Sequence, residues 1–255
     1  MNENKIYENV ISLGYFCNVA LEIERIGLRK ASYPFDWIIT SDFNMVIQLI
    51  KSEFKSFMLY DNLYQEYAIN PDYYFDIENT IHFYHDFSSK ISLKDQFKNV
   101  KNKYGRRINR FFKDIKKPTL FVRYITNKKE FEFINENYAE IDSLLKSFNK
   151  ANTIIYITNE KNFAENNNVK TFYTEKDKKE SVSRKFLNSS PDIKKFLLGT
   201  VDISKNDYKK NIKRAKHKFI RRKINSAKKK ILSLVKNIFR INDKNTYRHN
   251  KQYQL

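Results

Sequence analysis

The chain of 255 residues has few of the residues that interrupt helices and strands or form cross-links, with four glycines, four prolines and one cysteine. It also has a single tryptophan. A single cysteine excludes an intrachain disulfide and any metal site built from several cysteines, and it fits a reducing compartment. No stretch approaches the ~18 apolar residues of a membrane-spanning helix, and the polar N-terminus lacks the apolar centre of a signal peptide. We therefore expect a soluble, cytoplasmic protein.

Positive charge is abundant but unevenly distributed. Residues 176–255 hold 25 Lys and Arg against 6 Asp and Glu, a difference of +19. The remaining 24 basic and 23 acidic residues leave residues 1–175 almost neutral. This change in composition predicts a first domain over residues 1–175 and a basic, largely helical extension over residues 176–255.

Apolar runs with β-branched or aromatic residues alternate along the first domain with segments of helical periodicity. The expected strands are 9–13, 80–87, 119–125, 153–158 and 169–174. One expected helix begins at residue 17, and the others span residues 43–57, 92–114 and 138–149. Strands that alternate with helices at these spacings predict an α/β fold, a mostly parallel Rossmann-like sandwich. In such sheets, functional residues gather at the carboxyl ends of the strands.

The segment 9–37 is the most informative part of the sequence. An apolar run ends at Gly14, and from Cys17 onward the apolar residues recur at helical spacing, which indicates a strand, a tight turn and a helix. Cys17 would then lie in the first turn of that helix, where unpaired N–H groups and the helix dipole favour an anion such as a thiolate. The alternative is a small buried cysteine without chemical activity.

Several short motifs resemble one known family. SLGYFC followed by GLRKASYPFDWI, the HDF tripeptide at residues 85–87, and KYGRRINRF leading into PTLFVRY are similar to the bacterial family DUF1796, described as putative papain-like cysteine peptidases. The resemblance implies that Cys17 is a nucleophile. A papain-type sheet is antiparallel, whereas the periodicity here predicts a parallel one, and we expect the parallel arrangement.

A cysteine nucleophile requires a base, and usually a group that orients the base. His217 and His249 lie in the basic extension, which leaves His82 and His85, and these point to opposite faces of an extended strand. The resemblance favours His85 because it belongs to the HDF motif, and Asp36 of PFDW is the candidate orienting group. A histidine satisfied by a backbone carbonyl is the structural alternative, and a metal site at residues 82–86 is disfavoured.

Six further residues are candidates for contact with substrate. Arg123 lies in an apolar strand, where an arginine requires a ligand or a buried partner, so a structural salt bridge is its alternative role. The six candidates are Gly14, Asn18, Arg29, Ser32, Trp37 and Arg123. We expect no metal and no cofactor, since the single glycine of SLGYFC is not a dinucleotide fingerprint and the chain has no G-K-[ST] phosphate loop.

These observations leave three hypotheses for function. The first is a cysteine-dependent enzyme of the papain-like peptidase, hydrolase or acyltransferase type. The second is a transferase of bacterial surface-polysaccharide biosynthesis that acts on a glycan or activated sugar. The third is a non-enzymatic, membrane- or RNA-associated binding protein. The basic amphipathic pattern of residues 211–240 favours an anionic membrane surface as partner, with nucleic acid less favoured and packing on the protein's own domain as the alternative.

Overall fold

The computed structural model describes residues 7–164, 169–177 and 182–251, and the chain forms two compact units, Met1–Asn211 and Ile212–Leu255. The first unit therefore extends well beyond the boundary at residue 175 expected from composition. The reason is that apolar residues after the charged segment, such as Phe186 and Leu197, are fully buried.

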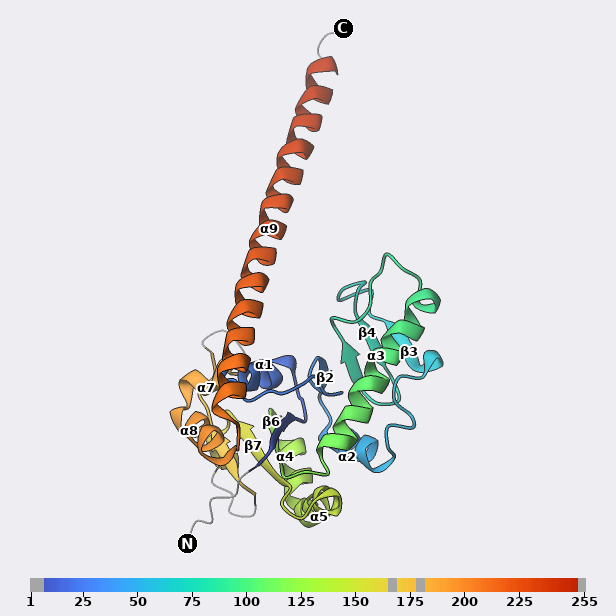
Figure 1. The fold of residues 1–255 in the computed structure, drawn as a ribbon. Helices are drawn as coiled ribbons and strands as arrows, with labels where there is room; N and C mark the ends of the chain where they lie inside the picture. Colours follow the sequence, from blue (N-terminus) through green and yellow to red (C-terminus); the bar gives the residue numbers. More distant parts are fainter. Residues whose placement is uncertain (1–6, 165–168, 178–181, 252–255) are drawn as a thin grey trace. The chain divides into compact units, whose positions relative to one another are not determined.

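The first unit contains both strands and helices, as Figure 1 shows. The strands are β1 (Asn9–Ser12), β2 (Ile38–Thr40), β3 (Leu63–Gln65), β4 (Tyr74–Asp76), β5 (Ile81–Phe83), β6 (Thr119–Ile125), β7 (Thr153–Thr158) and β8 (Thr171–Tyr173). The helices are α1 (Cys17–Arg25), α2 (Phe43–Lys51), the 3₁₀ turn η1 (Tyr60–Asn62), α3 (Leu93–Asp114), α4 (Lys128–Glu136), α5 (Tyr138–Phe148), α6 (Lys161–Ala164), α7 (Phe186–Ser189), α8 (Pro191–Thr200) and α9 (Lys205–Lys251).

The larger apolar strands form a four-stranded parallel sheet in the order β1-β6-β7-β8. Successive residues of β6 enter opposite cores: Val122 and Tyr124 belong to one buried cluster, and Phe121 and Ile125 belong to the other. Helices α1, α7 and α8 supply the first of these clusters, whereas α2, α3, α4 and α5 supply the second. The sheet is thus covered on both faces, which accounts for its continuous apolar runs.

A second sheet is inserted between β1 and β6. Its four short strands are antiparallel and lie in the order β2-β5-β4-β3. The expectation of an α/β fold is confirmed, but that of a mostly parallel sheet is wrong, because the named strands divide equally between the two arrangements. The antiparallel strands have three residues each and lie among polar loops, so their alternation is too short to be recognised in the sequence.

The second unit consists of the continuation of helix α9, which begins at Lys205. Within the described residues, no helix combines the length and the apolar character needed to cross a membrane.

Candidate functional site

The turn between β1 and α1 holds an unusual backbone. Gly14 and Tyr15 have φ angles of 83° and 66°, which lie in the left-handed region. A Cβ atom on Gly14 would lie 2.6 Å from the Thr40 hydroxyl oxygen, so a side chain does not fit there. Tyr15 is not a glycine, and its backbone is strained at a cost of roughly 1–3 kcal/mol. The neighbouring structure has to impose this conformation.

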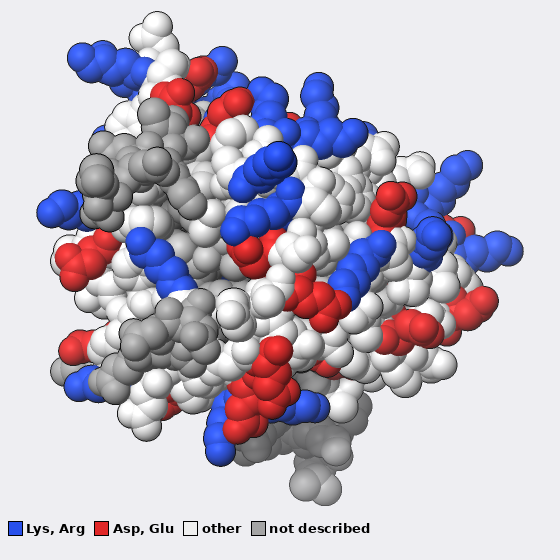
Figure 2. Space-filling model, turned by 90° about the horizontal axis from the view of Figure 1, so that it is seen from below, with Lys and Arg blue, Asp and Glu red and all other residues white. Residues whose placement is uncertain are grey.

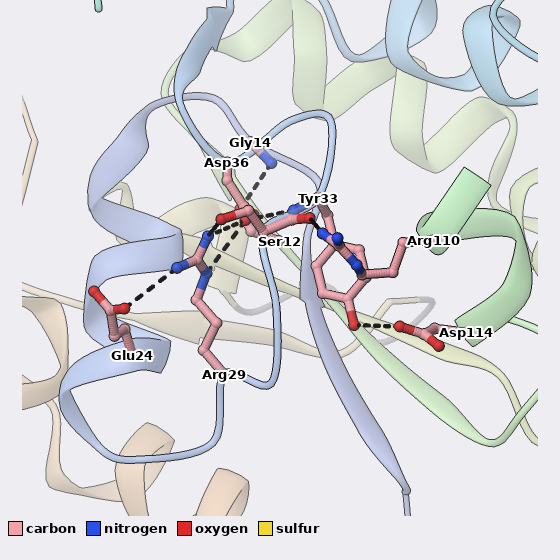
Figure 3. Close-up of polar contacts among 9 residues, drawn as sticks. Ser12, Gly14, Glu24, Arg29, Tyr33, Asp36, Arg110 and Asp114 are labelled. Atoms are coloured by element: carbon pink, nitrogen blue, oxygen red, sulfur yellow. Dashed lines mark hydrogen bonds and ion pairs between the residues drawn. The ribbon is translucent and has the colours of Figure 1, made fainter. Parts of the chain in front are cut away.

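Thr40 of β2 supplies much of that constraint. Its hydroxyl accepts a hydrogen bond from the Tyr15 N–H at 3.1 Å, and its own N–H donates to the Tyr15 carbonyl at 3.0 Å. The Ser12 hydroxyl accepts from the Gly14 N–H at 3.0 Å, also drawn in Figure 3. The turn is therefore fixed from both the parallel sheet and the antiparallel sheet.

Cys17 is the first residue of α1, as expected from the sequence, and its side chain is half-buried. Its thiol donates to the side-chain oxygen of Asn18 at 3.5 Å, while the Asn18 amide donates to the Arg184 carbonyl at 3.0 Å. The N-cap residue Phe16 makes no side-chain hydrogen bond to the helix, and the first turn holds no acidic residue. The N-terminal end of α1 therefore favours negative charge at the position of Cys17.

Arg123 is completely buried beneath this turn. Its guanidinium donates to Glu130 Oε1 at 2.6 Å, to the Leu13 carbonyl at 3.0 Å, and to the hydroxyl and carbonyl oxygens of Thr40 at 2.6 Å each. Burial raises the pKa of Glu130, and the charge of Arg123 opposes that shift. These contacts correspond to the structural salt bridge that was the alternative to a role in substrate binding.

Asp36 and Arg29 form a second buried pair, shown in Figure 3. The Oδ2 atom of Asp36 accepts from Arg29 Nη2 at 2.5 Å, from Arg29 Nε at 3.2 Å and from the Tyr33 N–H at 2.8 Å. Burial raises the pKa of Asp36, and Arg29 opposes the shift. Arg29 also donates to the Ser32 hydroxyl at 2.9 Å and lies 5.0 Å from the centre of the half-buried Trp37 ring.

This segment is tied to helix α3. Arg110 donates to the Ser32 carbonyl at 2.8 Å, and the Tyr33 hydroxyl donates to Asp114 at 2.9 Å (Figure 3). The two sequence motifs that contain these residues, GLRKASYPFDWI and KYGRRINRF, thus contact each other. Part of the family signature is therefore explained by packing, and Asp36 is occupied by Arg29 and Tyr33 in this structure.

The candidate histidines lie on and just after β5 of the antiparallel sheet. His82 is half-buried, and its Nδ1 atom lies 2.9 Å from Glu66 Oε2, which is the arrangement of a base and an orienting carboxylate. Register pairs His82 with Ile39, the neighbour of Thr40. Sequence reasoning missed Glu66, because it lies in the polar segment before β4 and gives no local signal.

His85 is exposed, and the next residue of its motif, Asp86, contacts helix α3. The carboxylate of Asp86 accepts from Lys103 at 2.5 Å and from the Tyr104 hydroxyl at 2.8 Å. Burial, with a further contribution from Asp86, raises the pKa of Tyr104 well above its usual range. Among the residues described by the structure, no group of three or more His, Cys, Asp or Glu side chains is placed to hold a metal ion.

A family model described as "Putative papain-like cysteine peptidase (DUF1796)" matches residues 8–159, a range that includes Cys17, both β5-region histidines and Arg123. An uncharacterised protein of Acanthamoeba polyphaga mimivirus is 29% identical, in an alignment that covers 60% of this chain and 78% of the viral protein. No solved structure matches the chain. Because the family model covers more than half of its length, the chain belongs to the DUF1796 family.

Proposed function

We propose that the protein is a cysteine-dependent hydrolase or acyltransferase, with Cys17 as the nucleophile toward a peptide or related acyl bond. The observation that carries this proposal is the position of Cys17, half-exposed at the start of α1 and directly after a strained turn. Strain held by surrounding contacts is a feature of functional sites, because it costs stability and has to be retained for a reason. Family membership supports the same class of chemistry.

The reaction requires a base that first accepts and then returns a proton. Transfer of the thiol proton to an imidazole leaves a thiolate, whose sulfur forms a bond to the carbonyl carbon of the substrate. The bond to the leaving amine or alcohol then breaks, and the imidazolium gives that group its proton. Water, or another acceptor in a transferase, cleaves the thioester and restores the thiol. The N-terminus of α1 favours the anionic states of this cycle.

The base belongs to the β5 region in this proposal. The family motif favours His85, which we retain as the base predicted from sequence, with Asp36 positioning the neighbouring loop through Arg29. The contact of His82 with Glu66 favours His82 instead, since that carboxylate would fix the orientation of the imidazole ring. Ser32 and Trp37, which are half-buried beside Arg29, remain proposed contacts for the acyl substrate.

Alkylation of the single cysteine tests the nucleophile directly. We expect iodoacetamide at pH 6.5 to modify Cys17 faster in the native chain than in the same chain unfolded in guanidinium chloride, because only the folded chain has the α1 N-terminus. Slower reaction in the native chain would contradict the proposal. It would favour a structural cysteine and the transferase or binding hypotheses.

Paired variants test the base. We expect an electrophilic acyloxymethyl ketone peptide to label the wild type at neutral pH and to label neither Cys17→Ser nor the variant that lacks the base. His82→Gln and His85→Gln should differ at least tenfold in labelling rate, and the slower one identifies the base. Glu66→Gln should slow labelling only if His82 is the base. Equal labelling of both histidine variants and the wild type would reject the cysteine–histidine pair.

A further inference from the structure

The second unit presents an apolar stripe on a basic helix. Helix α9 extends through Lys251, and residues 212–255 contain 15 Lys and Arg but one Asp, a net charge of +14. Apolar residues recur at positions 220, 224, 227, 231, 234 and 238, at steps of three and four. This spacing places them on one side of a helix. The unit lies outside the segment matched by the family model, so the proposed cysteine chemistry does not account for it.

The isoleucine side chains described in this stripe are exposed. Ile220, Ile224 and Ile231 are between 49% and 60% exposed, and Phe219 next to the stripe is 51% exposed. Exposed apolar residues in a continuous row on a soluble protein mark a surface that binds something. The partner has to offer both an apolar phase and negative charge.

We propose that this helix binds the surface of an anionic lipid bilayer and lies in the interface plane. Its apolar row would enter the boundary between headgroups and acyl chains, while lysine and arginine side chains on the flanks reach the anionic headgroups. Each basic residue near such a surface strengthens binding by roughly a factor of five. At 1.5 Å per residue, a helix of this length covers about 70 Å of membrane.

Two other partners fit the same residues less well. Nucleic acid would neutralise the charge through its phosphates but would leave the isoleucine row in water. A second copy of the helix would cover the row, but Lys and Arg at positions 221, 223, 228 and 230 flank it on both sides and would face like charges. The charge is concentrated in this unit, since residues 212–255 carry a net +14 of the +20 of the whole chain. On the face of the protein drawn in Figure 2, acidic and basic side chains are intermixed.

Vesicle sedimentation with the full-length chain tests the proposal. We expect binding to vesicles of phosphatidylcholine with 30% phosphatidylserine, little binding to phosphatidylcholine alone, and loss of binding at high salt. Arg214→Gln, Arg221→Gln and Lys228→Gln together remove three exposed charges and should lower the partition coefficient on the order of a hundredfold. The partition coefficient should also fall, at unchanged charge, in the triple variant Ile220→Ser, Ile224→Ser and Ile231→Ser.

A matched control removes the same charge from the first unit. Lys55→Gln, Lys90→Gln and Lys98→Gln together affect three exposed lysines and should leave vesicle binding unchanged within twofold. Circular dichroism of each variant verifies that the helix is retained. Three outcomes would each overturn the proposal. They are an equal loss of vesicle binding in the α9 and control variants, vesicle binding that does not depend on lipid charge, and binding to RNA but not to vesicles.

Discussion

At the scale of single residues, the motif SLGYFC is explained by backbone geometry as much as by chemistry. Gly14 supplies a left-handed conformation where no Cβ fits, and Ser12 and Thr40 hold the residues around it. This turn determines the position of Cys17. The sequence predicted the turn and the helix start, because an apolar run, a glycine and a helical repeat are local signals.

Substitution of Gly14 measures how strongly the turn is constrained. We expect Gly14→Ala to lower the free energy of unfolding by about 1–3 kcal/mol, because alanine is strained at positive φ and its Cβ meets the Thr40 hydroxyl. The matched control is Gly105→Ala within α3, where no atom lies within 4 Å of the added Cβ, and a gain of about 0.5–1 kcal/mol is expected. Urea unfolding of both variants makes the comparison. A neutral Gly14→Ala would show that the turn adapts.

The ion pair of Arg123 was predictable from the sequence only in part. The need for a buried partner was predictable from an arginine in an apolar strand. Its partner Glu130 was not identified, although Asn127 caps α4 by accepting from the Glu130 N–H at 2.9 Å, a spacing that marks a helix start. The sequence could likewise not show that Asp36 pairs with Arg29. An aspartate that orients a catalytic histidine and an aspartate that forms a structural ion pair look the same in a sequence.

Removal of Arg123 leaves a carboxylate buried without its partner. We expect Arg123→Met to lower the free energy of unfolding by about 3–5 kcal/mol, because Glu130 stays in the core. Addition of Glu130→Leu should restore part of this loss, as measured by urea unfolding of the single and double variants. If the double variant is less stable than Arg123→Met, the ion pair is not the source of the effect.

At the scale of elements, long apolar segments were predictable and short ones were not. Strands β6 and β7 match the segments expected at 119–125 and 153–158, because seven and six consecutive residues carry a clear signal. Helix α2 ends at Lys51, before the expected end at residue 57, since Glu53 and Phe54 adopt positive φ. The spacing of apolar residues alone does not show whether they lie in a helix or in a turn that packs against the core.

The contact between α1 and α7 should give the protein a pH-dependent stability. The carboxylate of Glu22 on α1 is buried, pairs with Arg25 and accepts from the Leu187 N–H at 3.4 Å. Burial raises the pKa of Glu22, so the folded state binds its proton more tightly than the unfolded state does. The stability from this group is therefore present below about pH 4.5 and is lost as pH rises through the raised pKa.

Glu22→Gln isolates that contribution. Urea unfolding should show the variant more stable than the wild type at pH 7 and similar to it near pH 4, because only the wild type acquires a buried charge as pH rises. An advantage of equal size at both pH values would point to a packing effect instead of ionisation.

At the scale of the whole molecule, composition placed the domain boundary at residue 175, whereas the first unit continues to Asn211. Charge dominates residues 176–211, but Ile193 and Leu197 cover the parallel sheet, and an isolated bridge joins Tyr7 to Val201. Composition does not reveal that a segment packs against strands that are distant in the sequence. The proposed site has the same limitation, since Cys17 follows β1 of the parallel sheet, whereas the candidate histidines lie on and just after β5 of the antiparallel sheet.

Truncation distinguishes the two boundaries. We expect residues 1–211 to unfold cooperatively in urea, and residues 1–175 to lack a cooperative transition because one face of the parallel sheet loses α7 and α8. Near-ultraviolet circular dichroism and urea titration provide the measurement. A cooperative, stable 1–175 fragment would show that the later helices are accessory.

The pairing of β1 with β6 also determines the order in which the chain can fold. Register partners Asn9 and Thr119 are 110 residues apart, and the complete antiparallel sheet lies between them in the sequence. During synthesis, β1 leaves the ribosome long before its neighbour exists, while the small sheet forms from nearby strands and shortens the loop that remains to be closed. Cys17, which follows β1 in the chain, therefore reaches its final environment late.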